Sequence, residues 1–202
     1  MLGLSLAHRV QLEKSDTING NINSTSILGY LNKGMLEVIP KISFIKSNMV
    51  LNNKYNADYK TINVGLKTKL SKEFKIDNNL SVIPTASLIY NYTRGTEYKM
   101  DKLYTEYNGV HSLIGELGAK VKLKDFYIKA SMLNEFLGDS KYSIKDAIDE
   151  IKDKVENKDL WFNVGVGTEH KLDKNKYVYY SIEKEFGNKI SNKLKVNLGF
   201  IF

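Results

Sequence analysis

The chain has 202 residues, of which 42% are hydrophobic, and it carries no cysteine and a net charge of +7. This length suffices for one domain or one barrel, and the lack of cysteine excludes disulfides, thiol catalysis and Cys-ligated zinc. The positive charge comes from 28 lysines and only two arginines, which are spread along the chain among acidic residues. Because nucleic-acid-binding surfaces cluster their charge and favour arginine, we expect no nucleic-acid partner.

The hydropathy pattern does not indicate a helical membrane protein, and the first residues do not indicate a complete secreted protein. No stretch reaches the roughly 20 consecutive apolar residues of a membrane helix. Residues 1–9 lack the basic segment and the apolar run of about 7–15 residues that define a secretory signal. If the protein leaves the cytoplasm, we expect its signal upstream, and the chain is then the C-terminal piece of a longer protein.

Apolar and polar residues alternate in segments that recur along the whole chain, and each such segment predicts a β-strand with one apolar and one polar face. In chain order the expected strands are residues 2–12, 23–31, 36–44, 62–70, 80–92, 113–123, 126–132, 162–169, 178–186 and 194–202. The pattern does not assign the two faces of residues 23–31. A tilted strand of about 9–11 residues crosses a bilayer, whereas globular strands are mostly about 5–6 residues long.

The connections between these strands alternate in length. Those expected at 13–21, 47–58, 93–109, 137–159 and 187–192 alternate with those at 32–34, 71–79, 123–125 and 173–176, and the first set is mostly longer. Outer-membrane barrels have long external loops on one rim and short periplasmic turns on the other. The loop lengths therefore favour a barrel over a soluble sandwich.

The longest connection contains one helical pattern. Ile144, Ile148, Ile151 and Val155 recur at i, i+4, i+7 and i+11, which predicts a short helix with a narrow apolar stripe. Two roles stay open for this helix, a lid over the barrel mouth or a helix that packs on its own loop, and we favour the second.

The polar faces of the expected strands carry a dozen charged residues. Burying them in a soluble barrel would cost several kcal/mol each unless they are paired. If the sheet is turned inside out, they line a water-filled lumen, the apolar face meets lipid, and barrel closure satisfies the backbone. We therefore predict an all-β, antiparallel up-and-down transmembrane barrel. Its expected lumen-lining residues are Lys67, Lys69, Glu116, Lys120, Glu169, Glu183, Glu185, Lys195 and Asn197.

Five glycines share these polar faces, at positions 65, 118, 165, 167 and 199. They are compatible with space for another molecule in the pore and equally with strand curvature alone.

The last part of the chain resembles a known family. A Gly-rich strand (Val164 to Gly167), a Tyr-rich strand that ends in Phe186-Gly187 and a final strand with a terminal aromatic resemble the closing three strands of an autotransporter translocator domain, the β-barrel of type V secretion. Residues 112–118 are similar to the family's mid-barrel strand. The terminal series resembles the C-terminal signal read by the barrel assembly machinery, and its residues are Leu194, Val196, Leu198, Phe200 and Phe202.

This resemblance covers residues 60–202 best and implies that residues 1–202 are one partial, N-terminally truncated barrel domain, because the family barrel has twelve strands and a lumenal helix. It implies a location in the outer membrane, with the lipid bilayer, the assembly machinery and an upstream passenger as partners. The leading hypothesis is a translocator that anchors and exports that passenger. The alternatives are a free-standing small barrel that acts as an adhesin or narrow porin, and, with less support, a soluble ligand-binding barrel.

The sequence offers no catalytic set and no cofactor motif. His8, His111 and His170 are scattered and have no partner at the spacing of a metal site. His8 and His170 are expected at the membrane interface. His111 and Asp101 form the one pair that resembles an outer-membrane protease of the omptin type. Some family members cut themselves in the lumenal helix, which this sequence lacks, so no enzyme is expected.

Overall fold

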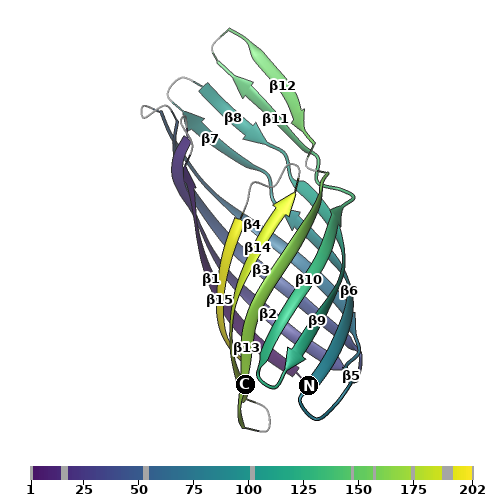
Figure 1. Ribbon diagram of the computed structural model, residues 1–202. Coiled ribbons are helices and arrows are strands. Elements are labelled where there is room, and N and C mark those ends of the chain that lie inside the picture. Colours follow the sequence, from purple (N-terminus) through teal and green to yellow (C-terminus); the bar gives the residue numbers. More distant parts are fainter. Residues whose placement is uncertain are drawn as a thin grey trace.

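The computed structural model describes residues 2–14, 18–51, 55–100, 103–146, 148–156, 158–173, 176–187 and 193–201. Within these residues the chain forms two antiparallel sheets and no helix (Figure 1). The large sheet contains, in order across it, β1 (Leu2–Lys14), β2 (Ile18–Lys33), β3 (Leu36–Leu51), β4 (Tyr55–Ser71), β6 (Leu80–Thr93), β9 (Val110–Leu123), β10 (Phe126–Glu135), β13 (Leu160–Asp173), β14 (Lys176–Gly187) and β15 (Lys193–Ile201). The two-residue strand β5 (Phe74–Lys75) pairs with β6.

The large sheet confirms the predicted up-and-down topology, since each of its strands other than the short β5 pairs with the next such strand along the chain. Two of the hairpins turn in only two residues. Lys33 pairs with Leu36 across Gly34, whose φ of +64° suits a residue without a side chain. Leu123 pairs with Phe126 across Lys124, which adopts a φ of 52°.

Three strands near the N-terminus are longer than predicted. β2, β3 and β4 have 16, 16 and 17 residues, so their ladders run through much of the segments at 13–21 and 47–58 that were expected to be loops. The apolar alternation stops before these strand ends, whereas backbone pairing between antiparallel neighbours does not require it. The prediction of loops was therefore wrong in these parts.

The predicted helix at Ile144–Val155 is also wrong. Ile144 belongs to β11 (Ser140–Lys145), and Ile151 and Val155 belong to β12 (Glu150–Val155). The two strands form a hairpin with Ile144 opposite Ile151, and Ile148 lies between them. A turn closes the hairpin, because Asp146 Oδ1 accepts the backbone N–H of Ile148 and of Asp149, each at 2.7 Å. Ile148 is 89% exposed, so no apolar stripe is buried and neither role considered for a helix applies.

The hairpin finds its partner in another long connection. β7 (Thr96–Met100) and β8 (Leu103–Tyr107) form a second hairpin, and β8 pairs with β11 to give a four-stranded sheet in the order β12-β11-β8-β7. Tyr rings stack across this sheet and onto β4, with centroids 5.7 Å apart for Tyr59 and Tyr98 and 6.0 Å apart for Tyr98 and Tyr107. Burial and the neighbouring Tyr107 raise the pKa of Tyr98.

The large sheet curves into a barrel shape (Figure 1). Its edge strands β1 and β15 approach within 8 Å between Cα atoms, although no ladder joins them within the described residues. Both chain termini lie at the end of the barrel that carries β5, and the four-stranded sheet lies beyond the opposite end (Figure 1). Among the described residues, no helix is long and apolar enough to cross a membrane.

Candidate functional site

The two faces of the large sheet differ in polarity, and the exposed face is the apolar one. On β15, Leu194, Val196 and Leu198 are 70%, 74% and 68% exposed, whereas Lys195 and Asn197 between them are only partly exposed. Water-soluble proteins show the reverse pattern, with apolar residues inside. The buried polar residues of the large sheet are Ser43, Ser47, Asn63, Ser81, Ser87, Asn163, Ser181, Glu183 and Glu185.

Ion pairs that reach over an intervening strand identify the polar face as the concave one. Lys67 Nζ of β4 lies 2.8 Å from Glu116 Oε2 of β9, although β6 runs between these strands. Lys120 of β9 likewise reaches Glu169 of β13 over β10, at 2.7 Å. Neighbouring strands are about 4.8 Å apart, so side chains two strands apart converge on the inside of the curve and diverge on the outside.

Every charged residue expected in the lumen takes part in an ion pair on this face, either over an intervening strand or between neighbouring strands. The pairs are Lys67 with Glu116, Lys69 with Glu37 at 3.6 Å, Lys120 and Lys122 with Glu169, Lys129 with Glu183, and Lys195 with Glu185. Glu37, Lys122 and Lys129 were recognised as polar-face residues but were not among the expected lumen set. Their alternation with apolar neighbours was the signal that could have placed them there.

Glu183 is the most densely bonded of these residues. Its carboxylate is 2.7 Å from Lys129 Nζ and accepts hydrogen bonds from Asn163 Nδ2 at 3.0 Å and Ser181 Oγ at 3.1 Å. Asn197 Nδ2, which was predicted at this face, donates to the same carboxylate at 3.0 Å. These bonds offset the cost of holding a carboxylate that is only 9% exposed. Asn163 and Ser181 alternate with apolar neighbours on their expected strands but were not among the expected lumen residues.

The glycines of the concave face are close to large side chains of the protein itself. A Cβ added at Gly167 would lie 2.5 Å from Tyr127 Oη, and one added at Gly199 would overlap the ring of Tyr179. At these two positions the space left by glycine is therefore filled by tyrosine of the neighbouring strand. Neither of the two interpretations drawn from the sequence, room for another molecule or strand curvature alone, included this packing against the protein's own tyrosines.

The histidines lie apart from one another and make local contacts. His8, in the middle of β1, bonds Thr25 at 3.0 Å, and His170, near the end of β13, lies 3.1 Å from Asp125. His111 bonds Tyr90 Oη at 2.7 Å, and Asp101 lies outside the described residues. Within the described part of the chain, no three His, Asp or Glu side chains gather into a metal site.

The architecture defines a class of protein. An up-and-down antiparallel sheet, curved into a barrel with an exposed apolar exterior and a charged, hydrogen-bonded interior face, is an outer-membrane β-barrel. The family model for the autotransporter β-domain matches residues 41–183, and the chain belongs to that family. The resemblance seen in the sequence is thereby confirmed: the chain is an outer-membrane translocator domain of type V secretion, a family of transport barrels that carry a passenger domain.

Two solved structures share the fold. The β-domain of the Bordetella autotransporter BrkA is 13% identical, with 100% of this chain and 97% of that chain covered and a TM-score of 0.57. The translocator domain of the autotransporter NalP from Neisseria meningitidis is 11% identical, with 98% of this chain and 72% of that chain covered and a TM-score of 0.58. At these identities the likeness concerns the fold alone. No curated protein matches the chain.

Proposed function

We propose that the concave face lines a hydrated lumen through which an upstream passenger crosses the outer membrane as an extended chain, with no catalytic residue in the barrel. The observation that carries this proposal is the network of ion pairs on the concave face, opposite an exposed apolar exterior. Charged groups need water or partners, and lipid supplies neither. The lining residues of the proposal are those predicted from sequence, together with Glu37, Lys122 and Lys129.

The chemistry of this lining suits transport of a chain rather than binding of one ligand. Each of the pairs Lys67–Glu116, Lys120–Glu169 and Lys129–Glu183 joins one positive and one negative side chain. The electrostatic fields of the two charges in a pair therefore largely cancel at a distance. A passing segment of either charge therefore meets no deep electrostatic well. Five buried polar atoms have no hydrogen-bond partner within the described residues, namely Ser47 Oγ, Asn63 Oδ1, Ser87 Oγ, Trp161 Nε1 and Asn163 Oδ1. Such groups are normally satisfied by water.

The same proposal gives the last strand a role in membrane assembly. In β15 the outward residues Leu194, Val196 and Leu198 alternate with inward polar ones, and the backbone of Phe200 pairs with that of Val178. Phe202 lies outside the described residues. We assign this series to recognition by the barrel assembly machinery, which would add β15 to an exposed sheet edge through backbone hydrogen bonds, with the apolar side chains as anchors.

Photocrosslinking of a stalled passenger tests the lumen directly. A reporter with a folded, stalling domain is fused upstream of Met1 behind a signal peptide, and benzoylphenylalanine is placed at residue 87 or at residue 88 of β6. Ser87 is 9% exposed on the concave face, and its neighbour Leu88 is 51% exposed on the outer face. We expect passenger crosslinks from residue 87 and none from residue 88.

Two results would contradict the proposal. Equal crosslinking from both positions, or crosslinking from residue 88 alone, would place the passenger outside the lumen. A reporter that stays in the periplasm although the barrel is folded and heat-modifiable in gels would favour the free-standing adhesin or porin instead.

A further inference from the structure

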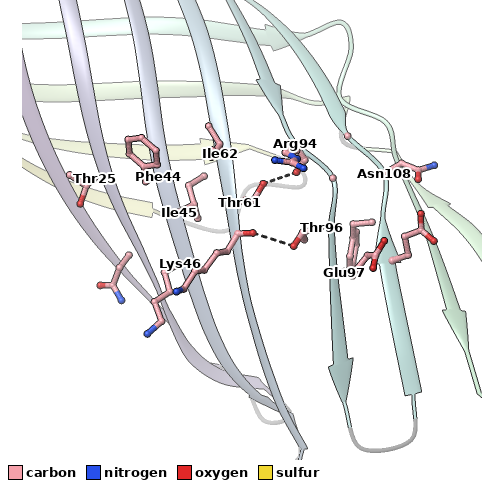
Figure 2. A pocket seen from close by; sticks show the side chains of 16 residues that line it. Thr25, Phe44, Ile45, Lys46, Thr61, Ile62, Arg94, Thr96, Glu97 and Asn108 are labelled. Carbon is pink, nitrogen blue, oxygen red and sulfur yellow. Dashed lines mark hydrogen bonds between the residues drawn. The ribbon is translucent and has the colours of Figure 1, made fainter.

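A groove of about 860 Å³ lies on the outer wall of the barrel, at the end that carries the four-stranded sheet (Figure 2). Strands β2, β3 and β4 form one side of the groove, and the segment from Arg94 into the β7–β8 hairpin forms the other. The residues that the argument uses are Asn23, Phe44, Lys46, Lys60, Ile62 and Arg94.

The strand register divides the barrel side of the groove into two rows. Thr25, Phe44 and Ile62 are paired across β2, β3 and β4, and they face outward. Two residues further along each strand, Asn23, Lys46 and Lys60 are paired in the next outward row. Because antiparallel strands rise about 3.4 Å per residue, the rows lie about 7 Å apart. The exposed apolar wall, which includes Phe44 at 51%, thus gives way to cations within one row.

This change marks the depth at which hydrocarbon meets the lipid headgroups. Exposed apolar side chains continue below Phe44 and Ile62, with Ile42 at 36% and Val64 at 43% exposed. Outer-membrane barrels place the limits of their apolar band at the two interfaces. The ammonium groups of the Lys46 row therefore lie at headgroup level, where their neighbours are lipids rather than protein.

The cations of the groove are gathered without ion-pair partners. Lys46 and Lys60 are direct cross-strand partners on one face, and like charges in that arrangement repel. The backbone of Arg94 is fixed beside them. Its backbone N–H donates to the carbonyl of Ile62 at 2.9 Å, and its backbone carbonyl accepts from Thr61 Oγ1 at 2.6 Å. None of the three cations forms an ion pair within the described side chains.

The acidic residues of the groove stand on the β7–β8 hairpin, across the groove from Lys46 and Lys60. Glu97 and Glu106 face each other as cross-strand partners on β7 and β8, and Glu97 accepts the hydroxyl of Tyr104. On the barrel wall, Lys46 and Lys60 therefore present positive charge without an ion-pair partner among the described side chains, directly above an apolar row.

We propose that this groove binds one outer-leaflet lipid whose headgroup carries a phosphate. Lys46, Lys60 and Arg94 hold the phosphate, and an acyl chain lies on Phe44 and Ile62. Arginine offers paired donors that match phosphate oxygens, and the two lysines relieve their mutual repulsion on the same anion. The apolar row selects a lipid over a free phosphate, since a free anion gains nothing from it. The inference is independent of passenger export.

Native mass spectrometry of the folded barrel in neutral detergent tests this proposal with three probes, namely phosphatidic acid, phosphatidylcholine and inorganic phosphate. We expect one phosphatidic acid per barrel, bound more tightly than phosphatidylcholine. In the triple variant Lys46→Gln, Lys60→Gln, Arg94→Gln, its affinity should fall about a hundredfold, since each basic residue near a lipid surface contributes about 1 kcal/mol.

A matched variant and a second substitution keep the test decisive. Lys33→Gln, Lys75→Gln, Lys124→Gln removes the same charge at exposed positions at the opposite end of the barrel and should leave the affinity unchanged. Phe44→Ser should weaken phosphatidic acid without affecting inorganic phosphate. Equal affinity of the wild-type chain and the triple variant, an equal loss in the matched variant, or inorganic phosphate that binds as tightly as phosphatidic acid would each overturn the proposal.

Discussion

A single lysine placed at the middle of the outer face distinguishes a lipid-facing wall from a water-facing one. Leu117 lies near the centre of β9, pairs with Ala86 of β6 and Met132 of β10, and is 59% exposed. In water, exchange of such an exposed residue for lysine would change stability by less than about 0.5 kcal/mol. In a bilayer the same exchange places a charge in hydrocarbon.

The magnitude follows from two contributions. Full transfer of a leucine from water is worth about 1.5–3 kcal/mol, so the exposed 59% of Leu117 contributes about 1–2 kcal/mol in lipid. A lysine at the midplane of an outer-membrane barrel costs about 2–4 kcal/mol in total. We therefore expect Leu117→Lys to lower the free energy of unfolding by about 2–4 kcal/mol and Leu117→Ala by about 1–2 kcal/mol.

Thr85→Lys is the matched control, because Thr85 pairs with Gly118 at nearly the same depth but on the concave face. Its lysine should reach water and cost less than about 1 kcal/mol. Urea unfolding in lipid vesicles can be followed through the fluorescence of Trp161, the single tryptophan of the chain. If Leu117→Lys unfolds at the wild-type urea concentration, or Thr85→Lys costs more than Leu117→Lys, the assignment of the two faces is wrong.

Three further predictions concern the interior and the external sheet. Lys129→Gln should destabilise the barrel by about 1–2 kcal/mol in the same urea assay, because Glu183 keeps its other donors, whereas Lys152→Gln in an exposed pair should have no measurable effect. Gly199→Ala should cost about 1–3 kcal/mol through overlap with Tyr179, and Tyr179→Ala should restore most of the loss; the absence of such rescue would refute the packing explanation. Hydrogen bonds from the backbone N–H groups of Asp149 and Ile148 lower the pKa of Asp146, so its contribution to the β11–β12 turn is complete above the ordinary aspartate pKa and is lost as pH falls through the lowered value. Amide exchange in this hairpin, corrected for intrinsic rates, should therefore accelerate in acid in the wild-type chain but not in Asp146→Asn, and equal acceleration in both would contradict this.

The strands of the C-terminal half were predictable because their side chains face two different environments. The expected strands 113–123, 126–132, 162–169 and 178–186 lie within β9, β10, β13 and β14, and β15 contains the described part of 194–202, since the alternation of residues such as Val196 and Asn197 reports lipid on one side and polar surroundings on the other. The ends of β2 to β4 carry no such contrast, and so their extension was missed. The helical spacing of Ile144 and Ile151 arose within a hairpin, in which these residues are directly opposite each other.

Contacts between distant strands could not be read from local pattern. The alternation placed Lys67 and Glu116 on polar faces, but their pairing over 49 residues depends on the curvature of the sheet. The groove beside Lys46 and Lys60 likewise needs the register of three strands and the path of the chain after β6. Curvature and register are properties of the whole sheet, which no single strand's sequence specifies.

The most direct test of the central claim is the environment of consecutive positions on β15. Because the chain has no cysteine, single variants at residues 194 to 198 can each carry one fluorescent label in lipid vesicles. Labels at Leu194→Cys, Val196→Cys and Leu198→Cys should be quenched by brominated lipid, and labels at Lys195→Cys and Asn197→Cys by aqueous iodide. Quenching by lipid at the odd-numbered positions, or the same quencher at all five, would contradict a barrel with its apolar face toward hydrocarbon.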